Sequence, residues 1–188
     1  MNNSEFIERV YQNKNNEIIL ERLQTARIND LWLVSGSLFQ TIWNTLTNRE
    51  PTYGIKDYDI FYFDDGDLSL NAENTVIKQI ELLFEDLNIN IEVKNQARVH
   101  LWYEQHFGIP YPPLSNSCEA IDRFLTPAAM VGIQPSKTLS LYAPKGLNDI
   151  SDMILRPNLS ANFSSKYYFE KANRWKEAWP ELTIKNIP

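Results

Sequence analysis

Two stretches decide the fold: Leu31-Trp32-Leu33-Val34-Ser35-Gly36-Ser37 and, after a helical pattern, Gly54-Ile55-Lys56-Asp57-Tyr58-Asp59-Ile60-Phe61-Tyr62-Phe63. The first is an apolar run that ends in Gly-Ser, and the second is a strand pattern that opens with two alternate aspartates. Because side chains alternate between the faces of a strand, Asp57 and Asp59 are predicted to point the same way, roughly 7 Å apart. Placing two like charges so close together is unfavourable away from water, so the pair indicates either a wet surface or a bound divalent cation.

The Gly-Ser turn connects a predicted strand to a predicted helix. Residues 31–34 are apolar on both faces, as expected for a strand in the middle of a sheet. Apolar residues at helical spacing follow up to Leu46, with Ser37 as the predicted N-cap. A helix that begins directly after a strand offers free backbone N–H groups to an anion. Gly36 and Ser37 are therefore a candidate phosphate site, and a capping role for Ser37 is compatible with it.

The rest of the chain alternates between helical and strand patterns. Strict alternation over 89–94 predicts a strand whose apolar residues face the core, while Glu92 faces the other way. The acidic turn at 64–67 lacks the ligand spacing of a calcium loop and is predicted to be a solvated loop. Further strands are predicted at 57–63, 130–133 and 138–142, a loop at 47–56, and helices at 4–13, 16–27, 71–87, 97–107, 119–125 and 165–178.

This order of elements predicts an α/β (α+β) fold in which helices cover a small sheet. A dinucleotide-binding fold is not expected, since no Gly-x-Gly-x-x-Gly follows a strand. The 188 residues fit a single domain, 1–188, with a helical extension at 1–28 and a mixed C-terminal portion at 110–188 packed on the core.

Composition excludes several classes of function. The formal net charge of -6 argues against an extended nucleic-acid surface, although it leaves room for a local basic pocket. Cys118 is the single cysteine, which rules out an intrachain disulfide and a cysteine-based zinc cluster, and we expect it to be a small buried or half-buried thiol. No apolar run approaches the roughly 18 residues of a membrane span, and the N-terminus lacks the pattern of a secretory signal. A cytoplasmic location is expected.

Three acidic side chains and one turn have the residue types that nucleotide transfer requires. Asp57, Asp59 and Glu92 offer hard oxygen ligands of the kind that Mg²⁺ prefers, with water and phosphate completing its shell. Phosphoryl transfer needs carboxylates that hold the metal, and a further carboxylate near the attacking hydroxyl can take its proton. Gly36-Ser37 supplies backbone N–H groups for the phosphates.

The same residues resemble the nucleotidyltransferase superfamily, which has a polymerase-beta-like fold. Gly-Ser at a strand–helix turn, an Asp-x-Asp strand and a later strand acid make up its motif. More narrowly, the chain resembles a bacterial nucleotidyltransferase-like family of unsettled substrate. That resemblance covers most of the chain after residue 30, through the segments 54–64, 95–103, 120–124, 143–149 and 155–158.

The superfamily resemblance implies a mixed central sheet with flanking helices and a divalent-metal-dependent transfer of a nucleoside monophosphate from a triphosphate. It implies that Asp57 and Asp59 are metal ligands, that Gly36 and Ser37 hold the triphosphate, and that Glu92 is the third acid, with Mg²⁺ or Mn²⁺ as cofactor. Two departures stand out. A longer helix and loop separate the Gly-Ser turn from the acids, and the third acid is Glu92 where the superfamily usually has Asp.

Several other residues have two interpretations. Lys56 and Arg49 either contact phosphates or are solvated loop residues. Arg98 and His100 lie two apart and cannot share a helix face closely, so His100 is expected to be a satisfied or exposed histidine rather than a base.

The aromatic residues of the second half either stack a base or belong to the core: Trp102, Tyr103, Tyr111, Trp175 and Trp179. The leading hypothesis is an enzyme that acts on a nucleotide and an unknown hydroxyl acceptor. The alternatives are a catalytically silent nucleotide-binding module with the same fold and, disfavoured by charge, a nucleic-acid-binding protein.

Overall fold

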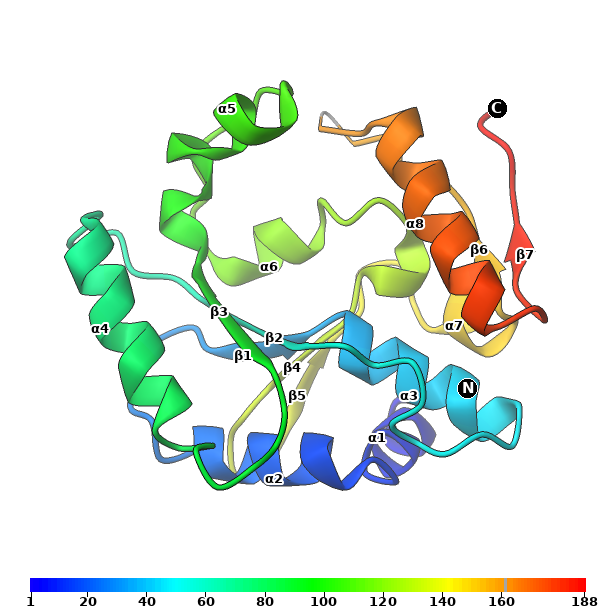
Figure 1. Ribbon diagram of the computed structural model, residues 1–188, viewed down its shortest axis with the longest axis horizontal. Coiled ribbons are helices and arrows are strands. Elements are labelled where there is room, and N and C mark those ends of the chain that lie inside the picture. Colours follow the sequence, from blue (N-terminus) through cyan, green and yellow to red (C-terminus); the bar gives the residue numbers. More distant parts are fainter. Residues whose placement is uncertain (161) are drawn as a thin grey trace.

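A five-stranded mixed sheet is the centre of the computed structural model, which describes residues 1–160 and 162–188 (Figure 1). The strand order is β3-β2-β1-β4-β5, in which only β2 and β3 are parallel. The predicted α/β fold with a small mixed sheet is confirmed. The strands are β1 (Trp32–Val34), β2 (Tyr58–Tyr62), β3 (Ile91–Asn95), β4 (Gly132–Gln134) and β5 (Ser140–Tyr142).

The helices surround this sheet, and a second, two-stranded parallel sheet lies beside the last of them (Figure 1). That small sheet, β6 (Ile154–Leu155) with β7 (Thr183–Ile184), was not predicted, because each strand has only two residues. The helices are α1 (Asn3–Val10), α2 (Lys14–Leu23), α3 (Gly36–Leu46), α4 (Leu70–Glu81), α5 (Tyr103–Phe107), α6 (Ser117–Ile121), α7 (Asn148–Ser151) and α8 (Ser165–Ala178), with 3₁₀ turns η1 (Gln96–Leu101) and η2 (Pro127–Ala129).

One face of the sheet is closed by a large apolar core. Alternate residues of β1, β2 and β3 enter it, among them Leu33, Ile60 and Val93, all at most 3% exposed. The N-terminal helices belong to the same core, since Phe6 and Val10 of α1 are fully buried there. Removing this much apolar surface from water is the main stabilising contribution to the fold.

The other face of the sheet is only partly covered. Trp32 and Val34 of β1 form a small second cluster with Ile121 of α6 and Met130. Gly132 allows this contact, because a Cβ at that position would come within 2.7 Å of the Ile121 side chain. In Figure 1, α5, α6 and α8 stand around this side of the sheet.

Two predicted helices are interrupted in the structure. The helix predicted at 71–87 ends at Glu81 and continues as three-residue turns, in which Leu83 donates to Ile80 and Phe84 to Glu81. A side chain from another helix favours this change, because Arg22 donates to the Leu83 carbonyl at 2.7 Å. The apolar stripe continues through the turns, so periodicity alone did not reveal the end.

The helix predicted at 97–107 is a 3₁₀ turn, η1, followed by the short helix α5. Asn95 caps η1 by accepting from the Ala97 N–H at 3.1 Å, and the backbone of Trp102 leaves the helical region at φ -130°. The tighter turn places Arg98 inside the protein.

The other boundaries agree more closely. The helix predicted at 165–178 is α8, with Tyr168, Ala172 and Trp175 buried along one stripe as expected. The helices predicted at 4–13, 16–27 and 119–125 are α1, α2 and α6, each shorter than predicted, and the predicted strands lie within about two residues of β1 to β5. In the described part of the chain, no helix is both long and apolar enough to cross a membrane.

Candidate active site

The start of α3 leaves two backbone N–H groups outside the hydrogen bonds of the helix, one on the partly exposed Gly36 and one on the fully buried Ser37. Leu38 and Phe39 both donate to the Ser35 carbonyl, so the N–H groups of Gly36 and Ser37 precede the first bonds of the helix. The prediction that Ser37 is the N-cap is wrong: Ser35 occupies that position, with a positive φ of 54° that is unusual for a residue other than glycine. The helix dipole adds a partial positive charge at this end.

Ser37 and Gly36 differ in what the fold requires of them. The Ser37 hydroxyl is fully buried and finds no hydrogen-bond partner among the described residues. A Cβ at Gly36 would meet only the Gln40 amide nitrogen, at an ordinary 3.5 Å, so the fold does not need glycine there. A small residue at this position instead keeps the approach to the N–H groups open.

The strand register places two of the predicted acids next to each other. Asp59 of β2 lies opposite Glu92 of the parallel neighbour β3 and opposite Val34 of β1. Residues that pair across a sheet share a face, so Asp59 and Glu92 lie on the partly covered face. Asp57 precedes Asp59 by two residues, at the end of β2 where α3 begins beside it after Val34.

The acids generate an excess of negative charge. Burial, followed by the charges of Asp57 and Glu92, raises the pKa of the Asp59 carboxyl to about 7. Lys171 of α8 and Lys94 of β3 oppose that change. Desolvation in turn lowers the pKa of Lys171, while Asp59 and Asp57 raise it. Two lysines therefore do not neutralise the three carboxylates, and the site favours a further cation.

The donor set fits a hard divalent cation of the magnesium type. Across residues 1–160 and 162–188, no three His, Cys, Asp or Glu side chains are grouped closely enough to hold a metal by themselves. Mg²⁺ usually takes only one or two carboxylates from the protein and completes its shell with water and substrate phosphate. Asp57 and Asp59, with their uncompensated charge, meet that requirement.

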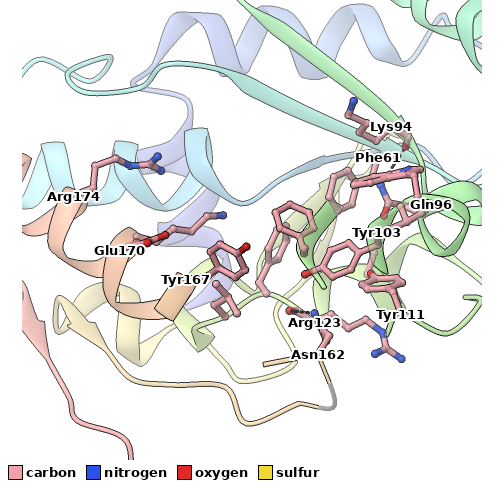
Figure 2. A pocket seen from close by; sticks show the side chains of 17 residues that line it. Phe61, Lys94, Gln96, Tyr103, Tyr111, Arg123, Asn162, Tyr167, Glu170 and Arg174 are labelled. Carbon is pink, nitrogen blue, oxygen red and sulfur yellow. Dashed lines mark hydrogen bonds between the residues drawn. The ribbon is translucent and has the colours of Figure 1, made fainter. Parts of the chain in front are cut away.

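A cavity of about 530 Å³ adjoins the acids on the same face (Figure 2). Phe61 and Lys94, each two residues beyond an acid on its strand, line it, as does Lys171. In Figure 2, Tyr167, Glu170 and Arg174 from α8 lie across the hollow from Phe61 and Tyr103, and Arg123 extends beside Tyr111. The remaining walls are largely aromatic and come from η1, α5 and the segment after it: Val99, Trp102, Phe107 and Tyr111.

Other candidate residues lie elsewhere. Arg49 forms an ion pair with Glu181 at 2.9 Å, so its charge is directed away from the acids. Arg98 is buried in an ion pair with Glu73 and donates to the Leu68 carbonyl at 2.8 Å, which makes it structural. His100 is partly buried, and its Nδ1 has no partner among the described residues. Lys56 is exposed immediately before Asp57.

The aromatic residues divide between both interpretations. Trp175 and Trp179 belong to the core, where Trp179 donates to the Asn44 side chain at 2.8 Å. Trp102, Tyr103 and Tyr111 line the cavity instead. Sequence reasoning missed Lys171 and Arg174. Their only signal is a stripe on α8 at helical spacing, Tyr167-Glu170-Lys171-Arg174, beside the buried one, and nothing in the sequence places that stripe near the acids.

Comparisons with known proteins agree with this geometry. A solved NMR structure, whose title says that it reveals a CCA-adding enzyme head domain, superposes with a TM-score of 0.78 and 26% sequence identity, covering 99% of this chain and 97% of that chain. No curated protein sequence matches the chain. A family model described as Nucleotidyltransferase matches residues 21–184. With the Gly-Ser turn and the strand acids in place, and this match over most of its length, the chain belongs to the nucleotidyltransferase family.

Proposed function

We propose that this protein is a metal-dependent nucleotidyltransferase that moves a nucleoside monophosphate from a triphosphate to a hydroxyl acceptor. Family membership supports a role in nucleotidyl transfer. The observation that carries the finer proposal is the position of Asp59, which lies opposite Glu92, follows Asp57 by two residues, and has an uncompensated charge. The excess negative charge favours binding of a cation, and the helix N-terminus beside it favours binding of a triphosphate, so the site can bind the two together.

Each residue has a defined task in this proposal. Asp57 and Asp59 hold Mg²⁺ or Mn²⁺, which neutralises charge on the transferring phosphoryl group. Glu92, expected from the sequence as a further ligand, is not grouped with them closely enough to form a three-residue metal site. The N–H groups of Gly36 and Ser37 hold the β- and γ-phosphates, and the exposed Lys56 adds a positive charge at the entrance. Glu92, on the edge strand β3, has the task of accepting the proton of the attacking hydroxyl in this proposal.

Isothermal titration calorimetry with ATP, GTP, CTP and UTP, with and without Mg²⁺, tests the proposal. We expect binding of at least one triphosphate that strengthens tenfold or more with Mg²⁺. Asp57→Asn and Asp59→Asn should each remove that metal dependence, since each deletes a charged ligand. Asp65→Asn, in the exposed acidic turn, is the matched control and should bind like the parent protein.

Release of pyrophosphate distinguishes an enzyme from a silent binding module. A nucleotidyltransferase releases pyrophosphate when a suitable hydroxyl acceptor is present, and Glu92→Gln should slow that release more than it weakens binding. Triphosphate binding without pyrophosphate release, for every acceptor tried, would favour the silent module. Absence of binding, or binding unchanged in both aspartate variants, would exclude the proposal.

A further inference from the structure

The cavity of about 530 Å³ beside the acids lies on the opposite side of them from the glycine turn. In the antiparallel pair of β1 and β2, Val34 is opposite Asp59 and Trp32 is opposite Phe61. The chain therefore runs from Val34 towards Gly36 on the Asp57 side, whereas the cavity begins at Phe61. The carboxylates separate the turn from the cavity.

If the proposed function holds, this order of turn, carboxylates and cavity determines the side from which the acceptor hydroxyl attacks. In-line transfer places the leaving pyrophosphate and the attacking hydroxyl on opposite sides of the α-phosphorus. Phosphates held at Gly36 and Ser37 would leave on that side, so the hydroxyl must approach from the side of the cavity. Glu92 lies two residues before Lys94, which lines the cavity, so the third acid borders the path of attack.

The cavity wall consists largely of aromatic rings. The Tyr103 ring lies 4.6 Å from the Phe107 ring and 4.5 Å from the Tyr111 ring, and Phe107 meets Tyr167 of α8 at 5.5 Å. On the floor, Phe61 stacks on Phe124 with 23° between the ring planes. A continuous set of aromatic faces favours a planar aromatic ligand, because stacking requires a flat partner.

The charged residues of the cavity are mostly basic. Lys94 and Lys171 line it on the side of the acids and oppose their charge, and the two other cations of its lining, Arg123 and Arg174, accompany a single acid, Glu170. The Arg123 guanidinium lies over the Tyr111 ring at 5.1 Å, so this ring of the cavity lining has a cation on one of its faces. In a chain of net charge -6, this local excess of cations favours an anionic ligand.

We propose that this cavity is the acceptor site and that the acceptor is a small planar aromatic molecule carrying negative charge and a free hydroxyl. The inference rests on the proposed function for its chemistry. The acceptor oxygen forms a bond to the α-phosphorus, and Glu92 takes the proton of the attacking hydroxyl. The bond between the α-phosphorus and the oxygen that bridges it to the β-phosphorus breaks, and pyrophosphate leaves with the electron pair of that bond. The net charge of the chain disfavours a long nucleic acid as the occupant.

Three probes separate the two halves of this recognition in isothermal titration calorimetry. AMP has both a planar base and a negative charge, adenosine has the base alone, and ribose 5-phosphate has the charge alone. We expect AMP to bind about tenfold or more tightly than either half. Tyr103→Leu and Arg123→Gln should each weaken AMP about tenfold, with circular dichroism to verify folding. Tyr53→Leu, at an exposed tyrosine, and Lys145→Gln, in an exposed turn, are the matched controls.

A second titration with α,β-methylene-ATP and Mg²⁺ separates the acceptor site from the donor site. AMP that still binds in the presence of the saturating analogue, through Tyr103 and Arg123, supports the acceptor site. Competition between them would assign the cavity to the donor nucleoside and overturn the inference while sparing the proposed function. Cavity-dependent AMP binding, with no binding of the analogue, would instead overturn the proposed function and with it the acceptor role.

Two further outcomes also overturn the inference. AMP affinity unchanged in both Tyr103→Leu and Arg123→Gln would show that the cavity is not its site. A ten-nucleotide single-stranded RNA that binds a hundredfold more tightly than AMP through the same residues would replace the small acceptor by a nucleic acid.

Discussion

Two groups of charges near β3 contrast in how completely they are balanced. Glu73 and Arg98 form a closed pair: the carboxylate also accepts from the Asn95 N–H at 3.0 Å, and the guanidinium also donates to the Leu68 carbonyl at 2.8 Å. Asp59 instead lies near Asp57 and Glu92 with too few cations, and its carboxyl has a raised pKa. The closed pair joins α4 to η1 and is structural, whereas the unbalanced group is suited to binding a cation.

The largest expected effect comes from breaking the closed pair. Arg98→Ala should lower the free energy of unfolding by about 3–5 kcal/mol, because it leaves the Glu73 charge buried without a partner. Urea denaturation measures it. The double variant Glu73→Leu/Arg98→Met should lose less than the single variant, since no buried charge remains. A loss below about 1 kcal/mol for Arg98→Ala would contradict the description of this pair as structural.

Removing a charge from the unbalanced group should raise the free energy of unfolding, whereas breaking the closed pair should lower it. The pKa of Asp59 is raised in the folded protein from an ordinary 3.8 to about 7, so ionisation opposes folding as pH rises through that window. Asp59→Asn should therefore stabilise the metal-free protein by about 4 kcal/mol at pH 8, with little change near pH 4. Urea denaturation at both pH values measures this. Asp65→Asn is the control and should leave the stability unchanged. An Asp59→Asn variant that is less stable than the parent at pH 8 would contradict the difference proposed between the unbalanced group and the closed pair.

The glycine turn tests whether the unbalanced group works together with α3. Gly36→Ala should leave the free energy of unfolding within about 0.5 kcal/mol of the parent, because the new Cβ meets only the Gln40 amide at 3.5 Å. Binding of a triphosphate should weaken about tenfold, or about 1.4 kcal/mol, since the methyl group obstructs the approach to the N–H groups. Thermal unfolding measures the change in stability and calorimetry the change in binding. Equal losses of stability and of binding would show that the role of Gly36 is structural.

The smallest effect is expected at the surface, where the pairing of charges contributes little to stability. Arg156 pairs with Asp149 at 2.7 Å, but the Arg156 side chain is 49% exposed. Arg156→Ala should change the free energy of unfolding by less than about 1 kcal/mol, because water and salt screen such a pair. The same urea experiment measures it, and a loss as large as that of Arg98→Ala would show that burial does not distinguish the two pairs.

Local patterns predicted most elements, and failures had identifiable causes. The helix at 165–178 was predicted at its observed bounds, because an apolar stripe coincides with a Ser164 cap. The end of α4 was missed, because Arg22 from another helix binds a carbonyl there. The acids and the glycine turn were predicted as candidates because face parity is a local property of strands. Lys171 and the cavity were not, because they depend on where α8 packs.

The sequence by itself determined the alternation of elements, the face parity of Asp57, Asp59 and Glu92, and a strand–helix turn with open N–H groups. These follow from the periods of 2 and 3.6 residues and from the lack of hydrogen-bond partners at a helix start. Only the tertiary structure decided that the charge of Asp59 is not compensated by cations, whereas the charge of Arg98 is compensated by Glu73. It also decided that aromatic and basic side chains from α5, α6 and α8 surround one cavity. Charge balance depends on distances between residues far apart in the chain, and packing alone determines those distances.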